Sequence, residues 1–213
     1  RKRLRSILAR GHQVIAQEYV PGPPSNHYFI DGFIDRTGRV RALLARQRLR
    51  MYPPLFGNST CMKSVALAEA QAAADSVTRL LSAVHYRGMF SAEFKRDPRD
   101  GEFKILEVNA RAWWYVDFAA RCGVDVTSMA YRDALGDEVP EVHDYDVGRR
   151  LVYPYADYFA CRDLRGTGEL TLWAWAKSWL GAAQPVFRLD DPWPATAATA
   201  KILVGKLRKR LRR

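Results

Sequence analysis

Apolar and polar residues alternate along two neighbouring segments of the chain, residues 90–95 and 103–108. Alternation with a period of two is typical of β-strands, and both segments are rich in residues that favour strands. Between them, residues 97–101 read Asp-Pro-Arg-Asp-Gly. This is a turn sequence, because proline presets φ and glycine accepts a positive φ. The pattern therefore predicts a β-hairpin.

The chain before this hairpin contains more strand-like segments. Residues 28–35 and 40–46 predict a second hairpin, which turns at Arg36-Thr37-Gly38 and whose second strand continues to residue 50. Residues 13–20 predict a further strand, which ends where residues 21–26 form a proline-rich loop that no regular element can continue.

Helical spacing of apolar residues occurs mainly in the middle of the chain. Residues 64–86 predict the longest helix, and residues 115–122 and 126–135 predict shorter helices that end at glycines. Residues 137–213 are rich in Trp and Tyr and mostly irregular. Within them, residues 170–180 predict an amphipathic helix whose tryptophans pack internally or face a partner. We therefore expect a main domain over residues 1–136, followed by a C-terminal extension with a basic tail.

The register of the hairpin at residues 90–108 brings acidic side chains together. If the hairpin is centred on Asp100, Glu93 lies opposite Glu107, and Asn109 shares their face. Two carboxylates opposite each other repel, with Cβ atoms about 4.5–5.5 Å apart. A divalent cation would relieve this repulsion, and Mg²⁺ prefers such oxygen ligands. Arg111, on the same face, could hold a phosphate; an ordinary solvated hairpin face is the alternative.

Three arginines share one face of the strand that runs to residue 50. Arg46, Arg48 and Arg50 alternate along it, and three cations so close repel unless an anion lies between them. A triphosphate or a substrate carboxylate would serve. The alternative is a solvated basic edge that discourages further strand pairing. Lys95, on the face of Glu93, is a further candidate for the chemistry.

The net charge of +11 first suggests an anionic partner, but its distribution argues otherwise. Residues 1–10 hold five basic side chains and residues 201–213 hold seven, with no acidic residue in either segment. The other 22 basic side chains are matched by 23 acidic ones. The main body is therefore balanced. Nucleic acid or a membrane surface is not the expected partner, although binding of an anionic surface through the two ends stays an alternative.

The remaining composition indicates a globular, cytoplasmic protein. The sequence contains no apolar run near the ~20 residues of a membrane span and no signal peptide. Its three cysteines (Cys61, Cys122 and Cys161) are widely spaced, as expected of reduced thiols that pack in a core. The chain begins without Met, and residues 1–10 predict the end of a basic helix that stops at Gly11. We expect it to be part of a longer protein.

The acidic and amide residues also carry a family resemblance. Glu93 followed by Glu107-x-Asn109-x-Arg111 resembles the metal-binding end of the ATP-grasp superfamily. Within that superfamily, residues 93–101 and Ala130-Tyr-Arg-Asp-Ala-Leu-Gly136 resemble carboxylate–amine ligases. The resemblance covers residues 12–136 well. It implies an α+β fold with an antiparallel sheet flanked by helices, followed by the aromatic-rich, irregular or helical C-terminal extension.

The resemblance also implies a nucleotide site. Residues 13–26 correspond to the linker that receives adenine, so that backbone groups of Glu18, Tyr19 and Val20, beside Gln17, would bind the base. Relatives carry an acidic group for the ribose hydroxyls near the position of Asn26 or Ser25, and this departure leaves the ribose contact open. We expect Gln17, Glu18, Tyr19, Val20, Asn26 and Arg48 to bind ATP.

The reaction implied is ATP-dependent joining of a carboxylate to an amine or a thiol through an acyl phosphate. Glu93, Glu107 and Asn109 would bind one or two Mg²⁺ ions, with Mn²⁺ as an alternative metal. Arg111, Lys95 and Arg50 would be the catalytic cations. The partners implied are small carboxylate and amine substrates and upstream domains of the same parent chain, with a homodimer as a further option.

One motif that the family uses is missing from the sequence. Members of the family carry a glycine-rich phosphate loop before the adenine linker, and no such loop occurs here. We therefore expect these 213 residues alone to bind Mg-ATP weakly and to turn over nothing. The alternative from another class is a non-catalytic nucleotide-binding or assembly module.

Overall fold

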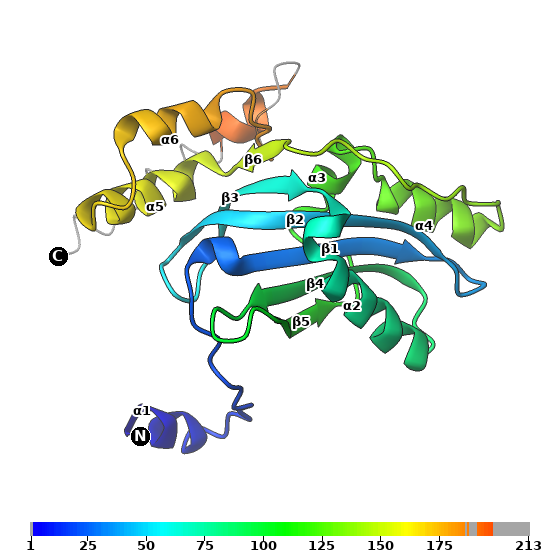
Figure 1. The fold of residues 1–213 in the computed structure, drawn as a ribbon, viewed down its shortest axis with the longest axis horizontal. Coiled ribbons are helices and arrows are strands. Elements are labelled where there is room, and N and C mark those ends of the chain that lie inside the picture. Colours follow the sequence, from blue (N-terminus) through cyan, green and yellow to red (C-terminus); the bar gives the residue numbers. More distant parts are fainter. Residues whose placement is uncertain (1, 186, 188–190, 198–213) are drawn as a thin grey trace.

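The computed structural model describes residues 2–185, 187 and 191–197. These residues form a six-stranded sheet with helices on both faces (Figure 1). The strands are β1 (His27–Ile34), β2 (Val40–Tyr52), β3 (Asn58–Val65), β4 (Gly88–Arg96), β5 (Phe103–Asn109) and β6 (Arg150–Val152). The described helices are α1 (Lys2–Leu8), α2 (Gln71–Ala83), α3 (Val116–Arg121), α4 (Val126–Leu135), α5 (Pro154–Gly166) and α6 (Leu172–Trp179), with short 3₁₀ helices at Pro24–Asn26 and Leu67–Ala70.

Every neighbouring pair of strands in this sheet is antiparallel, in the order β5-β4-β1-β2-β3-β6. Both predicted hairpins are present, as β1–β2 and β4–β5. The α+β class with an antiparallel sheet is confirmed. The two hairpins lie side by side because β1 also pairs with β4, and this pairing brings the residues of the first hairpin next to those of the second.

The predicted register of the β4–β5 hairpin is also confirmed at the acidic pair. Glu93 lies opposite Glu107, and Ser91 lies opposite Asn109. Nearer the turn the register shifts by one residue, so that Phe94 faces Ile105 and Leu106 is left without a direct partner. A bulge of this kind bends a strand and frees backbone groups for other contacts.

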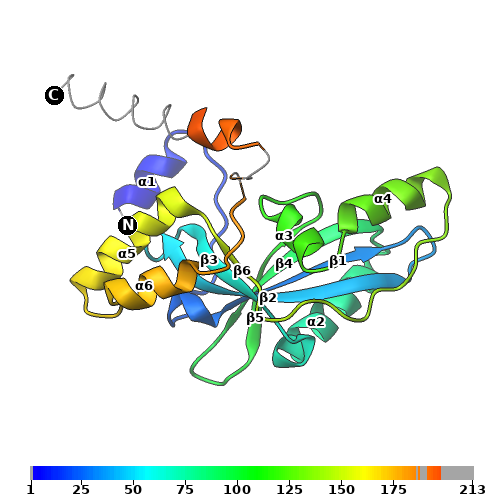
Figure 2. The ribbon, with the colours of Figure 1, turned by 90° about the horizontal axis from the view of Figure 1, so that it is seen from above.

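Each face of the sheet is covered by a different set of helices (Figure 2). One core packs α2 against alternate residues of the central strands, among them Ile30, Ala92 and Phe94. The other packs α3 and α4 against the opposite face, around Leu44 and Phe118. The faces alternate because successive side chains of a strand point to opposite sides. Glu93, between Ala92 and Phe94, therefore lies on the face opposite to α2.

Two predicted elements differ from those observed. Residues 13–20 form no strand in the structure. The helix predicted over residues 64–86 begins later, since β3 continues to Val65 and α2 begins at Gln71. Its buried residues are Ala73, Ala74, Val77 and Leu81. Leu80 and Val84, whose spacing from Val77 in the sequence fits the same helical face, are exposed.

The prediction for α4 is confirmed in detail. The helix runs from Val126 to Leu135, and the Asp125 side chain accepts a hydrogen bond from the backbone N–H of Ser128. Gly136 ends the helix with φ of 91°, a conformation that favours glycine.

The C-terminal extension joins the same sheet. β6 pairs with β3, and α5, which the sequence did not predict, follows directly. The boundary that we predict at residue 136 therefore does not interrupt the sheet. α6 matches the helix expected at 170–180. The basic segment 201–213 lies outside the described residues.

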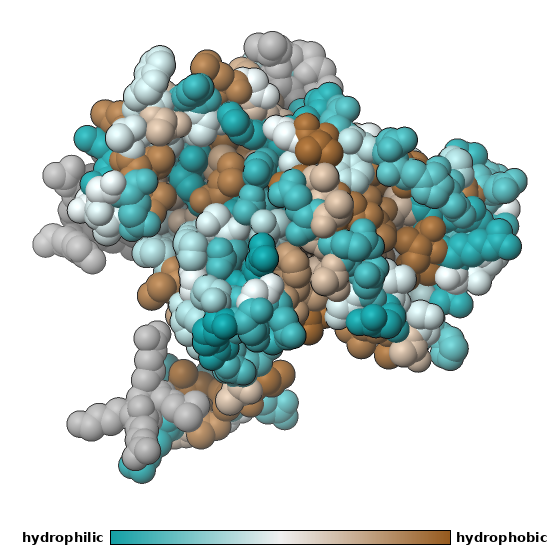
Figure 3. All heavy atoms as spheres, in the orientation of Figure 1, coloured by the Kyte–Doolittle hydropathy of each residue, from teal (hydrophilic) through white to brown (hydrophobic). Residues whose placement is uncertain are grey.

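The surface gives no sign of a membrane span. None of the helices in the described part of the chain is both long and apolar enough to cross a bilayer. Figure 3 shows hydrophobic residues in several separate spots on one face of the molecule. Trp173 and Leu180, in and just after α6, are among the exposed large hydrophobic residues.

Candidate nucleotide and magnesium site

The predicted arginines of β2, Arg46, Arg48 and Arg50, are buried, and each is paired with a carboxylate of the protein. Their partners are Asp31 for Arg46, Glu93 for Arg48 and Asp157 for Arg50. β2 is also paired on both sides, with β1 and β3. The alternative of a solvated basic edge is therefore wrong. The anions that separate these cations belong to the protein.

The pair of Arg46 and Asp31 has a structural role. Arg46 Nε donates to Asp31 Oδ2 over 2.7 Å, and the guanidinium lies 3.9 Å from the ring centroid of Phe29. The Ser91 hydroxyl donates to the second carboxylate oxygen. Both charges are almost fully buried, so these additional contacts offset the cost of their desolvation.

Arg50 lies at the C-terminal extension and not at the acidic pair. Its Nε and Nη2 donate to the two oxygens of Asp157 over 2.8 and 2.7 Å. Asp157 also accepts from the Thr60 hydroxyl and from the indole N–H groups of Trp175 and Trp179. The predicted catalytic role of Arg50 therefore has no support in its contacts, which attach α5 and α6 to the sheet.

Glu93 is half-buried and already has two partners. Arg48 Nη2 lies 2.9 Å from its Oε1, and His27 Nδ1 lies 2.8 Å from the same oxygen. Burial alone would raise the pKa of Glu93, but the hydrogen bond with His27 and the charge of Arg48 outweigh burial and hold it below its usual value. Burial lowers the pKa of His27. A neutral His27 can donate its Nδ1–H to Glu93.

These contacts correct one step of the sequence argument. The repulsion between Glu93 and Glu107 does not need a metal, because Arg48 already neutralises Glu93. The other predicted residues are free: the side chains of Glu107 and Asn109 make no hydrogen bond or ion pair within the described part of the chain, and both lie on the Glu93 face. Arg111 is exposed, and its Nη1 donates only to the Ala112 carbonyl.

The donor set fits a hard divalent cation. Glu93 Oε2, the Glu107 carboxylate and the Asn109 amide oxygen are oxygen donors with no partner among the described residues, and Mg²⁺ accepts a few such donors when phosphate and water complete its shell. The described residues contain no group of three or more His, Cys, Asp or Glu side chains that could hold a metal without such help.

The predicted adenine linker lies against the β4–β5 hairpin. Gln17 Nε2 lies 3.3 Å from the carbonyl oxygen of Leu106, the residue that the bulge leaves unpaired. Glu18 forms an exposed ion pair with Arg99 in the hairpin turn, with 2.7 Å between Oε1 and Nη2. The Asn26 amide donates to the carbonyl of Arg96 over 3.0 Å. The fold thus brings the linker to the acidic pair.

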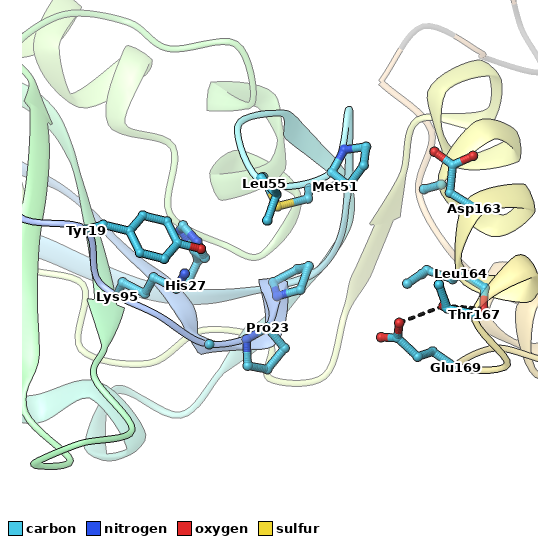
Figure 4. A pocket seen from close by; sticks show the side chains of 14 residues that line it. Tyr19, Pro23, His27, Met51, Leu55, Lys95, Asp163, Leu164, Thr167 and Glu169 are labelled. Atoms are coloured by element: carbon cyan, nitrogen blue, oxygen red, sulfur yellow. Dashed lines mark hydrogen bonds between the residues drawn. The ribbon is translucent and has the colours of Figure 1, made fainter. Parts of the chain in front are cut away.

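A pocket of about 290 Å³ lies between the linker, the sheet and α5 (Figure 4). Tyr19 and Pro23 form the linker wall, and His27 and Lys95 come from the sheet. Lys95 is 5% exposed, and its ammonium forms no hydrogen bond or ion pair within the described residues. Its Nζ lies 5.3 Å from the ring centroid of Tyr19. A buried cation without an anionic partner indicates a place for an anion of a ligand.

Comparison with known proteins supports the fold. No family model matches the sequence. The D-aspartate ligase of Enterococcus faecium is 27% identical over 125 residues, which are 58% of this chain and 29% of that protein. The L-amino acid ligase of Bacillus licheniformis has a TM-score of 0.51 and 21% identity, over 63% of this chain and 35% of that one. For the phosphoribosylaminoimidazole carboxylase ATPase subunit of Aquifex aeolicus, the TM-score is 0.50 with 16% identity, over 64% and 40% of the two chains.

This chain has an ATP-grasp fold. The matched region spans about a third of the length of these relatives. Sequence reasoning missed two residues that contact predicted site residues, His27 and Asp157. His27 follows the proline-rich loop, where no pattern marked it, and its role is visible only from its contact with Glu93. Asp157 stands in a segment that we expected to be irregular, so its pairing with Arg50 had no signal in the sequence.

The buried lysine of the ATP-grasp sheet gives a testable prediction. Burial lowers the pKa of Lys95, and the charge of Arg48 adds to this effect. Lys95→Met should therefore raise the free energy of unfolding at pH 7 by about 1 kcal/mol, because it removes an unpaired buried charge. The same change should weaken ATP binding. Chemical denaturation and calorimetric titration would measure the two effects.

The sign of the pH dependence follows from the lowered pKa. Between the folded-state pKa and the unfolded value of about 10.4, the unfolded chain holds more protons than the folded chain, so the stability of the parent protein rises with pH. The gain in the free energy of unfolding that Lys95→Met gives should be full at neutral pH and disappear towards pH 10. A variant that is less stable than the parent at pH 7 would contradict the unpaired charge.

Proposed function

We propose that this protein is the magnesium- and nucleotide-binding part of an ATP-dependent ligase that joins a carboxylate to an amine or a thiol. The observation that supports the proposal most strongly is the set of oxygen donors beside Glu93: Glu107 and Asn109 share its face, and their side chains have no hydrogen bond or ion pair among the described residues. In a folded protein, groups of this kind gathered beside a pocket are the usual mark of a ligand site.

The reaction that we propose has two steps. A substrate carboxylate oxygen attacks the γ-phosphorus of ATP, the bond between the γ-phosphorus and the bridging oxygen breaks, and ADP leaves. The nitrogen of the amine then attacks the carbonyl carbon of the acyl phosphate and loses a proton, and phosphate leaves with the electron pair of the broken bond. Positioning and neutralisation of charge are the main contributions of protein in such transfers.

The residues of this chain have separate roles in the proposal. Glu93, Glu107 and Asn109 would hold one or two Mg²⁺ ions, which supply charge neutralisation at the phosphates. Arg111 would bind the transferring phosphoryl group, with Lys95 holding an anionic group deeper in the pocket. Arg48 keeps Glu93 ionised and oriented. Arg50 is not part of this site, because Asp157 occupies its guanidinium.

The thiols of Cys61 and Cys122 are not expected to take part in the proposed reaction. Burial raises the pKa of Cys61 and of Cys122 to about 11, so neither is a thiolate near neutral pH. A covalent intermediate on either cysteine is therefore not expected. Any thiol that reacts would belong to the acceptor substrate.

We further propose that the catalytic unit is larger than these 213 residues. The chain matches only part of its relatives, and its sequence has no glycine-rich phosphate loop. Substrates and partners thus belong to the complete enzyme. The chain alone should bind Mg-ATP weakly and release no ADP.

The test is ADP release by the full-length protein that contains this chain, supplied with Mg²⁺, ATP and a panel of carboxylates and amines. The proposal expects ADP to appear only with a matching pair of substrates. Nucleotide binding that depends on Mg²⁺, without ADP release under any condition, would favour the non-catalytic nucleotide-binding module. Robust ADP release by the 213 residues alone would show that our view of the catalytic unit is mistaken.

A further inference from the structure

The pocket beside Lys95 has one wall that the predicted nucleotide site did not include. It comes from the second half of α5 and the residues that follow: Ala160, Asp163, Leu164, Thr167 and Glu169. In Figure 4 the labelled side chains of this wall, from Asp163 to Glu169, lie across the pocket from Tyr19, His27 and Pro23. The C-terminal extension therefore contributes directly to the pocket.

The polarity of the pocket shows how a nucleotide would lie in it. Glu93 and Lys95 are two residues apart on β4 and share a face, so the Lys95 end of the pocket is next to the proposed metal site and suits phosphate. From there the pocket leads between apolar side chains, among them Pro23, Met51 and Leu55. Such surroundings suit a planar base and its sugar.

Hydrogen-bond acceptors for the sugar or the base are found on the new wall. Asn26 does not line the pocket, and its amide is bonded to the Arg96 carbonyl. The carboxylates among the lining residues are those of Asp163 and Glu169. Carboxylates are acceptors when ionised, and they commonly bind ribose hydroxyls in nucleotide sites.

Both carboxylates can still accept hydrogen bonds from a ligand. The Thr167 hydroxyl donates to Glu169 Oε1 over 2.6 Å, which orients this carboxylate and leaves Oε2 without a partner among the described residues. Asp163 has one weak contact, 3.4 Å between Oδ1 and Arg162 Nη2. α5 itself is held to the sheet by Asp157 and Arg50. The wall is thus preorganised and not a loose tail.

We propose that the C-terminal extension closes the nucleotide pocket and that Glu169, together with Asp163, accepts hydrogen bonds from donor groups of the nucleoside half of ATP. This inference rests on the proposed function. Its second support is Lys95, a side chain nine-tenths buried in the same pocket that has no hydrogen bond or ion pair within the described residues. The donors of the nucleoside are the ribose hydroxyls and the amino group of the base.

The experiment measures binding of three nucleotides to the 213-residue chain in the presence of Mg²⁺ by calorimetric titration. They are ATP, 2′,3′-dideoxy-ATP, which lacks the hydroxyls, and purine riboside triphosphate, which lacks the amino group. Glu169→Ala and Asp163→Ala are compared with the parent chain. Glu138→Ala is the matched control, because Glu138 is exposed and outside the pocket.

We expect Glu169→Ala to weaken ATP binding about tenfold or more, as loss of a hydrogen bond to a charged group does. The analogue that lacks the group donating to Glu169 should bind the parent chain more weakly than ATP by a similar factor. In the variant, ATP and that analogue should bind equally well. If this analogue is 2′,3′-dideoxy-ATP, the hydrogen bond is to the ribose; if it is purine riboside triphosphate, the bond is to the base. Circular dichroism would check that each variant is folded.

The outcomes separate this inference from the proposed function. If no nucleotide binds the parent chain, both are overturned. If ATP binds with Mg²⁺ but Glu169→Ala and Asp163→Ala keep the affinity and the discrimination of the parent, the nucleotide site stands and the role of the extension is overturned.

Discussion

Replacing Glu107 by Gln should lower ADP release by the full-length protein at least a hundredfold. Loss of a group that merely orients a metal ligand costs about 10–100-fold, and Glu107 is proposed as a direct ligand. It is exposed and has no protein partner among the described residues, so the change should not disturb the fold. The measurement is kcat/KM for ADP release at saturating Mg²⁺.

The same variant should keep its stability, which separates a loss of activity at the site from a loss of folding. Glu107→Gln removes one of two like charges that face each other across β4 and β5, so its thermal stability should equal or slightly exceed that of the parent. Glu102→Gln is the matched control, since Glu102 is exposed in the turn of the same hairpin and pairs with Lys104. Full activity of Glu107→Gln would remove the metal assignment.

Replacing Asp157 by Ala should lower the free energy of unfolding by about 3–5 kcal/mol, the usual cost of leaving a buried charge without its partner. Asp157 is fully buried and accepts from Arg50, Thr60, Trp175 and Trp179. For a chain of this size the loss corresponds to a fall in Tm of about 10 °C. Differential scanning calorimetry would measure it.

Two further variants separate loss of charge from loss of packing. Asp144→Ala, an exposed carboxylate in a loop, should leave Tm unchanged. The double variant Arg50→Met with Asp157→Leu should recover part of the loss, because an apolar pair needs no desolvation of charge. Recovery should be incomplete, since the indole N–H groups of Trp175 and Trp179 lose their acceptor. An Asp157→Ala protein as stable as its parent would disprove the structural role.

Local patterns predicted the hairpins well. The register that pairs Glu93 with Glu107 follows from the turn sequence and the period of two, and both are properties of neighbouring residues. The end of α4 follows equally from Gly136. By contrast, the strand predicted over residues 13–20 has no partner in the sheet. Its valines, isoleucine and tyrosine favour a strand, but pairing depends on the course of the rest of the chain, which the segment alone does not determine.

The partners of charged residues could not be predicted. Arg46, Arg48 and Arg50 share a face, as expected, yet each meets a carboxylate that lies far away in the sequence. Only tertiary structure decides which of three equivalent arginines neutralises Glu93 and which anchors α5. The sequence therefore predicted correctly that Glu93 lies opposite Glu107. It did not predict that Arg48 balances the charge of Glu93.

The structure of the C-terminal extension was also only partly predictable from the sequence. Composition separated residues 137–213 from the rest, and the tryptophans of α6 were expected to pack or to face a partner. Two of them, Trp175 and Trp179, donate to Asp157, whereas Trp173 is exposed. Nothing in the sequence indicated that α5 would complete a pocket with the linker. This is why the wall formed by Asp163 and Glu169 emerged only from the fold.

The most direct test of the proposed site is the affinity of the 213-residue chain for ATP, measured by calorimetry with Mg²⁺ and with EDTA. Our account predicts weak binding that requires the metal and is lost in Glu107→Gln. Affinity that is unchanged by removal of Mg²⁺, or equal in the parent and in Glu107→Gln, would contradict a magnesium–nucleotide site on this face of the sheet.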